Sequence, residues 1–102
     1  MNVWRLIADQ IRKRGNNPDR CVLFLEPGGD IIGKYHHGTK ETDMVPTKAN
    51  TMMLAFLGEK VPMKRIDKYT ADLNLQNNTG TLTAYGLSAT GEKVQHIERI
   101  TL

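Results

Sequence analysis

Apolar residues recur with two different periods along this chain, and each period predicts a different kind of element. At the start the spacing is three to four residues, which places the apolar side chains on one face of a helix. The residues with this spacing are Val3, Trp4, Ile7 and Ile11. Three basic residues follow, and Gly15 is placed to end the helix.

A second helical stripe lies near the middle of the chain. Pro46-Thr47 opens it, and we expect Gly58 to end it because glycine is favoured just past helix ends. The stripe falls at i, i+3, i+4, i+7 and i+8 and should form one buried face. Its members are Ala49, Met52, Met53, Phe56 and Leu57.

Between the two helices the sequence predicts a β-hairpin. Residues 21–25 form a short continuous apolar run, which is typical of a buried strand. The Pro-Gly-Gly-Asp segment at 27–30 supplies turn residues, and residues 31–36 can return as the partner strand. Residues 37–45 are polar and without periodicity, so we expect a loop.

The last 40 residues predict a three-stranded meander. Residues 69–75 alternate apolar and polar side chains, the two-residue period of a half-buried strand, and residues 81–89 and 94–102 are also strand-like. In the middle strand, apolar residues change parity between Ala84 and Tyr85. We therefore expect a bulge or bend beside Gly86.

The element order is αββαβββ, which predicts an α+β fold. Short turns between the strands favour a mainly antiparallel sheet, with both helices packed on one face. The chain has 102 residues and neither an internal repeat nor a long linker, so we expect one domain over residues 1–102.

Composition excludes several classes of protein. The apolar content of 39% is too high for a mainly disordered chain. The longest apolar run, residues 21–25, is far too short to span a membrane. Arg5 and Asp9 argue against a secretory leader, and a single cysteine favours a reducing compartment. Together these features predict a cytoplasmic protein without a membrane partner.

The net charge of +3 is distributed unevenly. Residues 1–40 hold seven cations and four anions, whereas residues 41–102 hold seven of each. The Arg12-Lys13-Arg14 cluster could mark a phosphate-binding face, with Arg12 and Arg14 as ligands. The alternative is that these cations complement the helix dipole and remain solvated.

One segment matches the phosphate-loop pattern G-x-x-x-x-G-K, from Gly28 to Lys34. The residue after the lysine is Tyr35, so the hydroxyl that would hold Mg²⁺ is missing. Ile31 and Ile32 occupy the part that must curl around phosphate, and no helix start follows. We interpret the match as coincidental and the segment as a hairpin.

The densest run of functional side chains is nevertheless here: Lys34, Tyr35, His36, His37 and Lys40. Histidine can exchange protons near neutral pH, lysine can stabilise an anion, and tyrosine can donate a hydrogen bond. Metal-free phosphodiesterase chemistry is conceivable with such groups. However, neighbouring strand residues point to opposite faces, and no spaced pair supports a metal site or catalysis. We therefore expect ligand contact without a catalytic, metal or cofactor site; the alternative is a solvated strand end and loop.

A second basic and aromatic segment lies around Pro62, where four cations precede Tyr69. They are Lys60, Lys64, Arg65 and Lys68. Cations interleaved with an aromatic ring suit nucleic-acid binding through phosphate contact and base stacking. Glu59 and Asp67 dilute this charge, and a solvated strand edge is the simpler interpretation.

These observations favour a small non-enzymatic binding protein for an anionic ligand, either nucleic acid or a phosphate-bearing small molecule such as a nucleotide. The alternative is a protein-interaction module, such as a homo-oligomeric accessory subunit, a viral-type subunit or an inhibitor that covers a partner's surface. The final strand, residues 94–102, could supply a sheet edge for such pairing, and we expect a homo-oligomer.

Overall fold

The computed structural model describes residues 3–13, 20–25, 31–35 and 47–102. For residues 31–35 and 47–50, and for Leu25 and Leu54, it describes the backbone and not the side chain. The elements are α1 (Val3–Lys13), β1 (Arg20–Leu25), β2 (Ile31–Tyr35), α2 (Thr47–Lys60), β3 (Arg65–Asn74), β4 (Thr79–Leu87) and β5 (Lys93–Thr101). Their order confirms the predicted αββαβββ fold of the α+β class.

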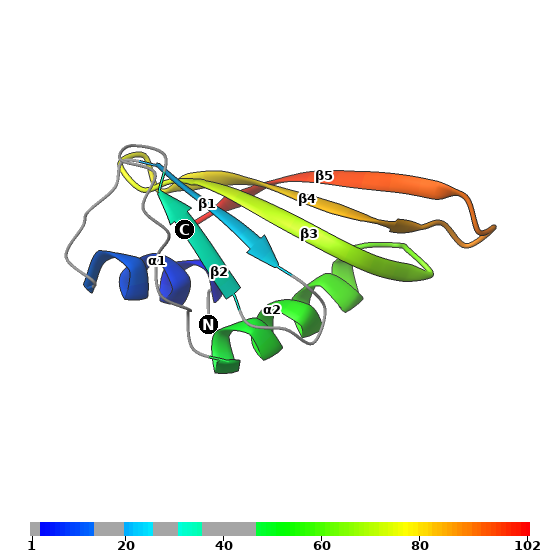
Figure 1. Ribbon diagram of the computed structural model, residues 1–102, viewed down its shortest axis with the longest axis horizontal. Coiled ribbons are helices and arrows are strands. Elements are labelled where there is room, and N and C mark those ends of the chain that lie inside the picture. Colours follow the sequence, from blue (N-terminus) through cyan, green and yellow to red (C-terminus); the bar gives the residue numbers. More distant parts are fainter. Residues whose placement is uncertain (1–2, 14–19, 26–30, 36–46) are drawn as a thin grey trace.

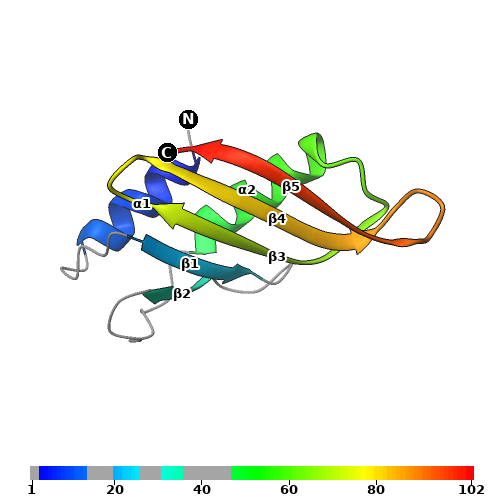
Figure 2. The ribbon, with the colours of Figure 1, turned by 90° about the horizontal axis from the view of Figure 1, so that it is seen from above.

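The strands form one five-stranded sheet in the order β2-β1-β3-β4-β5. Every pairing is antiparallel. The predicted hairpin of β1 and β2 and the meander of β3, β4 and β5 are both present. They are joined because β1 pairs along β3, with Leu23 opposite Ala71. Both helices lie on the same face of this sheet (Figure 1), and seen from above they lie behind it (Figure 2).

The core fills the space between the helices and this covered face. Alternate residues of each central strand point toward the helices, and these are the fully buried ones. They include Leu23 of β1, Tyr69, Ala71 and Leu73 of β3, and Leu82 and Ala84 of β4. The helices contribute Trp4, Ile7, Ala8, Ile11, Met53 and Leu57. Met52 and Phe56 are partly buried at the side of the stripe.

The predicted end of the second helix is wrong. The helix continues through Gly58 to Lys60, and the Val61 N–H still donates to the Leu57 carbonyl at 2.8 Å. Gly58 is exposed and makes no special turn, so its missing side chain does not interrupt the helix. Pro62 comes next, and the steric limits of proline explain why the helix stops there.

The predicted irregularity beside Gly86 exists, but it lies in the partner strand. The β3–β4 register shifts between Ile66 and Lys68, opposite Gly86 and Tyr85. A Cβ atom on Gly86 would lie 1.8 Å from the Arg65 carbonyl oxygen, so the two backbones meet more closely than a side chain permits. The apparent parity change in β4 has a different cause: Tyr85 and Leu87 occupy the sheet face away from the helices.

Two glycine substitutions should therefore have opposite effects on the free energy of unfolding. We expect Gly86→Ala to destabilise by about 3 kcal/mol, because the added methyl group collides with the β3 backbone. Gly58→Ala meets nothing within 4 Å and should stabilise by about 0.5–1 kcal/mol through helix propensity. Urea denaturation of both variants measures this, and equal effects would contradict the close backbone contact.

Candidate functional site

The sheet face away from the helices, called the open face below, carries a row of side chains that crosses four strands. In register, Phe24 of β1 lies opposite Thr70 of β3, Thr70 opposite Thr83 of β4, and Thr83 opposite Ile97 of β5. Phe24 is 46% exposed and Ile97 60% exposed, the two large apolar residues in the described part that are most open to solvent. The row therefore presents two apolar groups with threonine hydroxyls between them.

Positive charge predominates around this row. Among the side chains that the structure describes, the cations at the open face are Arg20, Arg65, Lys68, Lys93 and Arg99, and the carboxylates are Asp67 and Asp72. Each carboxylate is held by an arginine. Arg20 donates two hydrogen bonds to Asp72, and the Arg65 Nε atom donates to Asp67 Oδ1 at 2.6 Å.

The remaining three cations, Lys68, Lys93 and Arg99, have no carboxylate partner among the residues that the structure describes. Their charge is therefore available to an anion from solution. Because Asp67 and Asp72 are already paired with arginines, they compete weakly for these three side chains.

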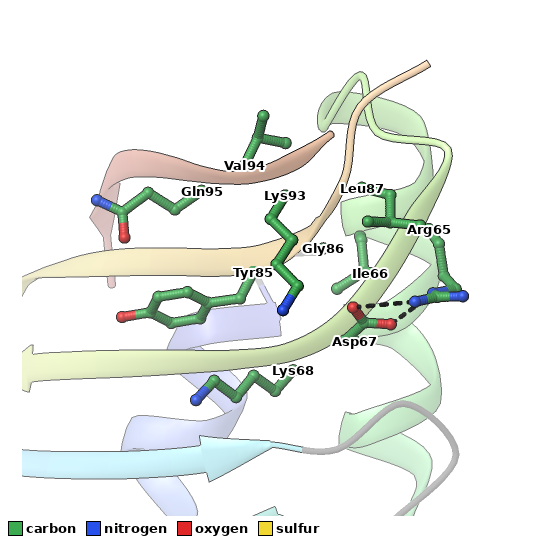
Figure 3. Close-up of a pocket in the computed structure, with 10 residues that line it drawn as sticks. All are labelled: Arg65, Ile66, Asp67, Lys68, Tyr85, Gly86, Leu87, Lys93, Val94 and Gln95. Carbon is green, nitrogen blue, oxygen red and sulfur yellow. Dashed lines mark hydrogen bonds and ion pairs between the residues drawn. The ribbon is translucent and has the colours of Figure 1, made fainter. Parts of the chain in front are cut away.

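A shallow hollow of about 860 Å³ lies at one end of the open face. We call it the basic hollow and define it by Arg65, Lys68, Tyr85, Lys93 and Gln95. The other lining residues are Ile66, Asp67, Gly86, Leu87 and Val94. Figure 3 shows its walls: β3 contributes Arg65 and Lys68, β4 contributes Tyr85, and β5 contributes Lys93 and Gln95.

The aromatic ring and one cation of the basic hollow are in direct contact. The Lys68 Nζ atom lies 4.9 Å from the centre of the Tyr85 ring, a cation–π distance. The register shift in β3 produces this pairing, because it sets Lys68 directly opposite Tyr85. The hollow can thus offer both a positive charge and a flat apolar surface to one ligand.

Arg12, a predicted ligand, makes hydrogen bonds within the fold and does not line the basic hollow. Its Nη2 atom donates to the Leu75 carbonyl at 2.7 Å and to Asn78 Oδ1 at 2.8 Å, and Nη1 lies 3.6 Å from Asp9. These contacts tie α1 to the turn between β3 and β4. The guanidinium is therefore engaged in the fold, on the helix side of the sheet.

The other predicted ligands are not assembled by the described structure. Arg14, His36, His37 and Lys40 lie outside the described residues. Lys34 and Tyr35 belong to β2, where their backbones pair with Val22 and Cys21. Lys34 stands in the register row that runs from Val22 through Asp72 and Thr81 to Arg99.

Sequence reasoning missed Tyr85, Lys93 and Gln95. Of the basic segment that it did consider, Lys68 and Arg65 belong to the basic hollow, but Tyr69 is fully buried. The missing signal was available in the strand period: Lys68 and Tyr85 fall on the polar parity of their strands, opposite to Tyr69 and Ala84. Charge totals over residues 41–102 cancel and hide this separation.

Cys21 is a buried free thiol on the covered face. Burial raises the pKa of this thiol to about 12, and the negative charge of Asp72 adds to the effect. Burial likewise raises the pKa of the Tyr69 hydroxyl to about 12. Both groups are therefore protonated at neutral pH, and neither is activated as a nucleophile.

The described part of the chain contains no group of three His, Cys, Asp or Glu side chains arranged to hold a metal ion. Within the same residues, no helix has the length and apolar character needed to cross a membrane. Comparison with protein families, with curated proteins and with solved structures found no match to this chain.

The Cys21 pKa leads to a prediction about alkaline stability. Because the folded pKa lies above the unfolded value of 9.0, the protonated thiol stabilises the fold below pH 9, and this stabilisation disappears as pH rises toward 12. The free energy of unfolding should therefore fall more steeply over this range in the wild type than in Cys21→Ala.

Alkylation by iodoacetamide at pH 8 gives a second test. Since the thiolate fraction depends on pKa, native Cys21 should react roughly a thousandfold more slowly than an unfolded cysteine. Rapid labelling of the native protein would contradict the burial of this thiol.

Proposed function

We propose that this protein binds nucleotide units, as free nucleotides or within single-stranded nucleic acid, through the basic hollow on its open face. The observation that carries the proposal is the contact between Lys68 and the Tyr85 ring, with Lys93 on the facing wall of the hollow. We propose binding without catalysis.

The chemistry of a nucleotide matches these groups. A phosphate needs positive charge, and Lys68 and Lys93, which have no carboxylate partner in the described part of the chain, can supply it. A base needs a flat surface for stacking, which an aromatic side chain such as Tyr85 provides regardless of sequence. Gln95 adds an amide that can both donate and accept hydrogen bonds.

The shape of the site supports a strand as well as a single nucleotide. A volume of about 860 Å³ lies in the usual range for small-ligand sites. The hollow adjoins the rest of the open face, where Thr70, Thr83 and Arg99 extend the polar surface. We therefore expect an oligonucleotide to bind more tightly than a mononucleotide, because it contacts further cations.

Charge reversal in the hollow should weaken binding of a labelled thymidine oligonucleotide of about 12 residues. We expect Lys68→Glu to raise Kd roughly tenfold or more, since a charge-assisted phosphate hydrogen bond contributes about 1.5–3 kcal/mol. The slope of log affinity against log salt should become shallower by about 0.7 for each phosphate of the single strand that the variant no longer neutralises.

Lys13→Glu is the matched control, because it makes the same change in net charge at an exposed position of α1. It lies beside Arg12 and Arg14, so it also tests the basic cluster predicted from the sequence. Unchanged affinity in this variant supports the hollow. Weaker binding by the Lys13 variant, together with unchanged binding by the Lys68 variant, would instead place the ligand at that cluster.

Tyr85→Leu separates stacking from charge. It should reduce affinity by about 1–3 kcal/mol while leaving the salt slope unchanged, because the same phosphates remain neutralised. ATP, AMP and the oligonucleotide, titrated in parallel at low salt, distinguish free nucleotides from strands. Absence of binding to all three would refute the proposed function.

A protein-interaction module is the second candidate, and one observation favours it. Phe24 and Ile97 expose apolar surface at the two ends of one row, and a partner's side chains could bury them. The partner could be another protein or a second copy of this chain. We propose the cytoplasm as the location in either case, since the one cysteine is a free thiol.

A further inference from the structure

β5 forms one edge of the described sheet, and its pairing with β4 fixes which backbone groups point away from the sheet. Glu92 accepts a hydrogen bond from Ser88 N at 2.9 Å, and Leu102 N donates to Asn78 O at 2.9 Å. Hydrogen-bonding direction alternates along an antiparallel strand, so even-numbered residues direct their N–H and C=O groups to β4. Gln95, Ile97 and Arg99 therefore direct theirs away from the sheet.

The residues on the two sides of Ile97 in β5 form complementary pairs. His96 and Glu98 flank it at equal distance, as do Gln95 and Arg99, and Val94 and Ile100. An antiparallel copy centred on Ile97 would therefore place His96 opposite Glu98, and Gln95 opposite Arg99. A centre on His96 or on Glu98 would instead place identical titratable groups opposite each other, which is unfavourable for carboxylates.

Within the described residues, one carboxylate oxygen of Glu98 has no hydrogen-bond donor, and such a copy would supply one. Its Oε2 atom is buried and accepts no hydrogen bond within the described structure, and the Nε2 atom of His96 in the same strand lies 3.7 Å away. A buried carboxylate oxygen without a donor is costly. His96 and Glu98 of two copies would form non-hydrogen-bonded backbone pairs, which bring side chains closest, with Cα atoms about 4.5 Å apart.

We propose that a second copy of this chain pairs along β5, antiparallel and centred on Ile97, so that two sheets become one. Ile97, which is 60% exposed, would be covered at the two-fold axis by its own counterpart. Gln95, Ile97 and Arg99 would form the hydrogen-bonded pairs, and His96 of each copy would donate to Glu98 of the other.

This pairing has a geometric consequence for the open face. The two-fold axis is perpendicular to the sheet at Ile97, so both copies present their open faces on the same side. Five strands from each copy would form one continuous surface, with an Arg99 on each side of the axis. The pairing does not depend on nucleotide binding, and the surface would serve any ligand of the open face.

Cysteine cross-linking tests both the pairing and its register. In Ile97→Cys the two thiols would lie on residues with Cα atoms about 5.5 Å apart, within reach of a disulfide. In Gln95→Cys the same pairing separates the two cysteines by four residues along the strands, about 13 Å, which a disulfide cannot span. Both positions are exposed, and Cys21 is buried.

Under mild oxidation we expect Ile97→Cys to give a disulfide-linked dimer and Gln95→Cys to form no disulfide between copies. In sedimentation experiments we expect the wild type to be a dimer at micromolar concentration. Equal coupling of the two variants, or faster coupling at Gln95, would overturn the register. A wild type that sediments as a monomer at all accessible concentrations would overturn the pairing itself.

Exchange of the charged pair provides an independent test. His96→Glu places carboxylates opposite each other and should weaken the dimer at least tenfold. Adding Glu98→His to this variant exchanges the two residues and should restore the dimer, because each glutamate then again faces a histidine of the other copy. Circular dichroism confirms folding of each variant, and failure of the exchange to restore a folded variant would contradict the proposed pairing of His96 with Glu98.

Discussion

The structure depends on one constraint: a single layer of two helices can cover only one face of an antiparallel sheet. Because strand side chains alternate between faces, the fully buried residues of β3 and β4 lie on the helix side. Tyr69, Ala71 and Leu73 satisfy this requirement in β3, and Leu82 and Ala84 do so in β4. The residues between them are consequently left to solvent on the open face, where their polar and basic character can serve binding.

Gly86 connects the fold to the basic hollow. Its missing side chain lets β4 approach the Arg65 carbonyl, opposite the place where the β3 register shifts. Lys68 then stands opposite Tyr85 and reaches the face of its ring. A local irregularity in strand pairing thus positions a cation against an aromatic surface, an arrangement typical of bulges that reorient side chains near binding sites.

The sequence predicted the element order and the α+β class because helical and strand periods are both strong in this chain. It did not predict the pairing of β1 with β3, which depends on contacts distant in sequence. The helix end predicted at Gly58 was wrong because glycine is favoured at helix ends but does not enforce them, and here the helix ends before Pro62. The sequence also could not show that Arg12 donates a hydrogen bond to the β3–β4 turn, 63 residues away. The basic hollow was missed because it combines three strands, and a charge total cannot show which face a lysine occupies.

The central claim is that the open face, and not the helix side, is the functional surface. Side-chain methyl resonances can test it directly, because Thr70 and Thr83 lie on the open face while Ala71 and Ala84 lie beneath the helices. During NMR titration with a thymidine oligonucleotide, we predict saturable shifts of the two threonine methyl signals and small changes at the two alanines. Shifts confined to the alanine methyls and to α1, with the threonine signals unchanged, would contradict the account.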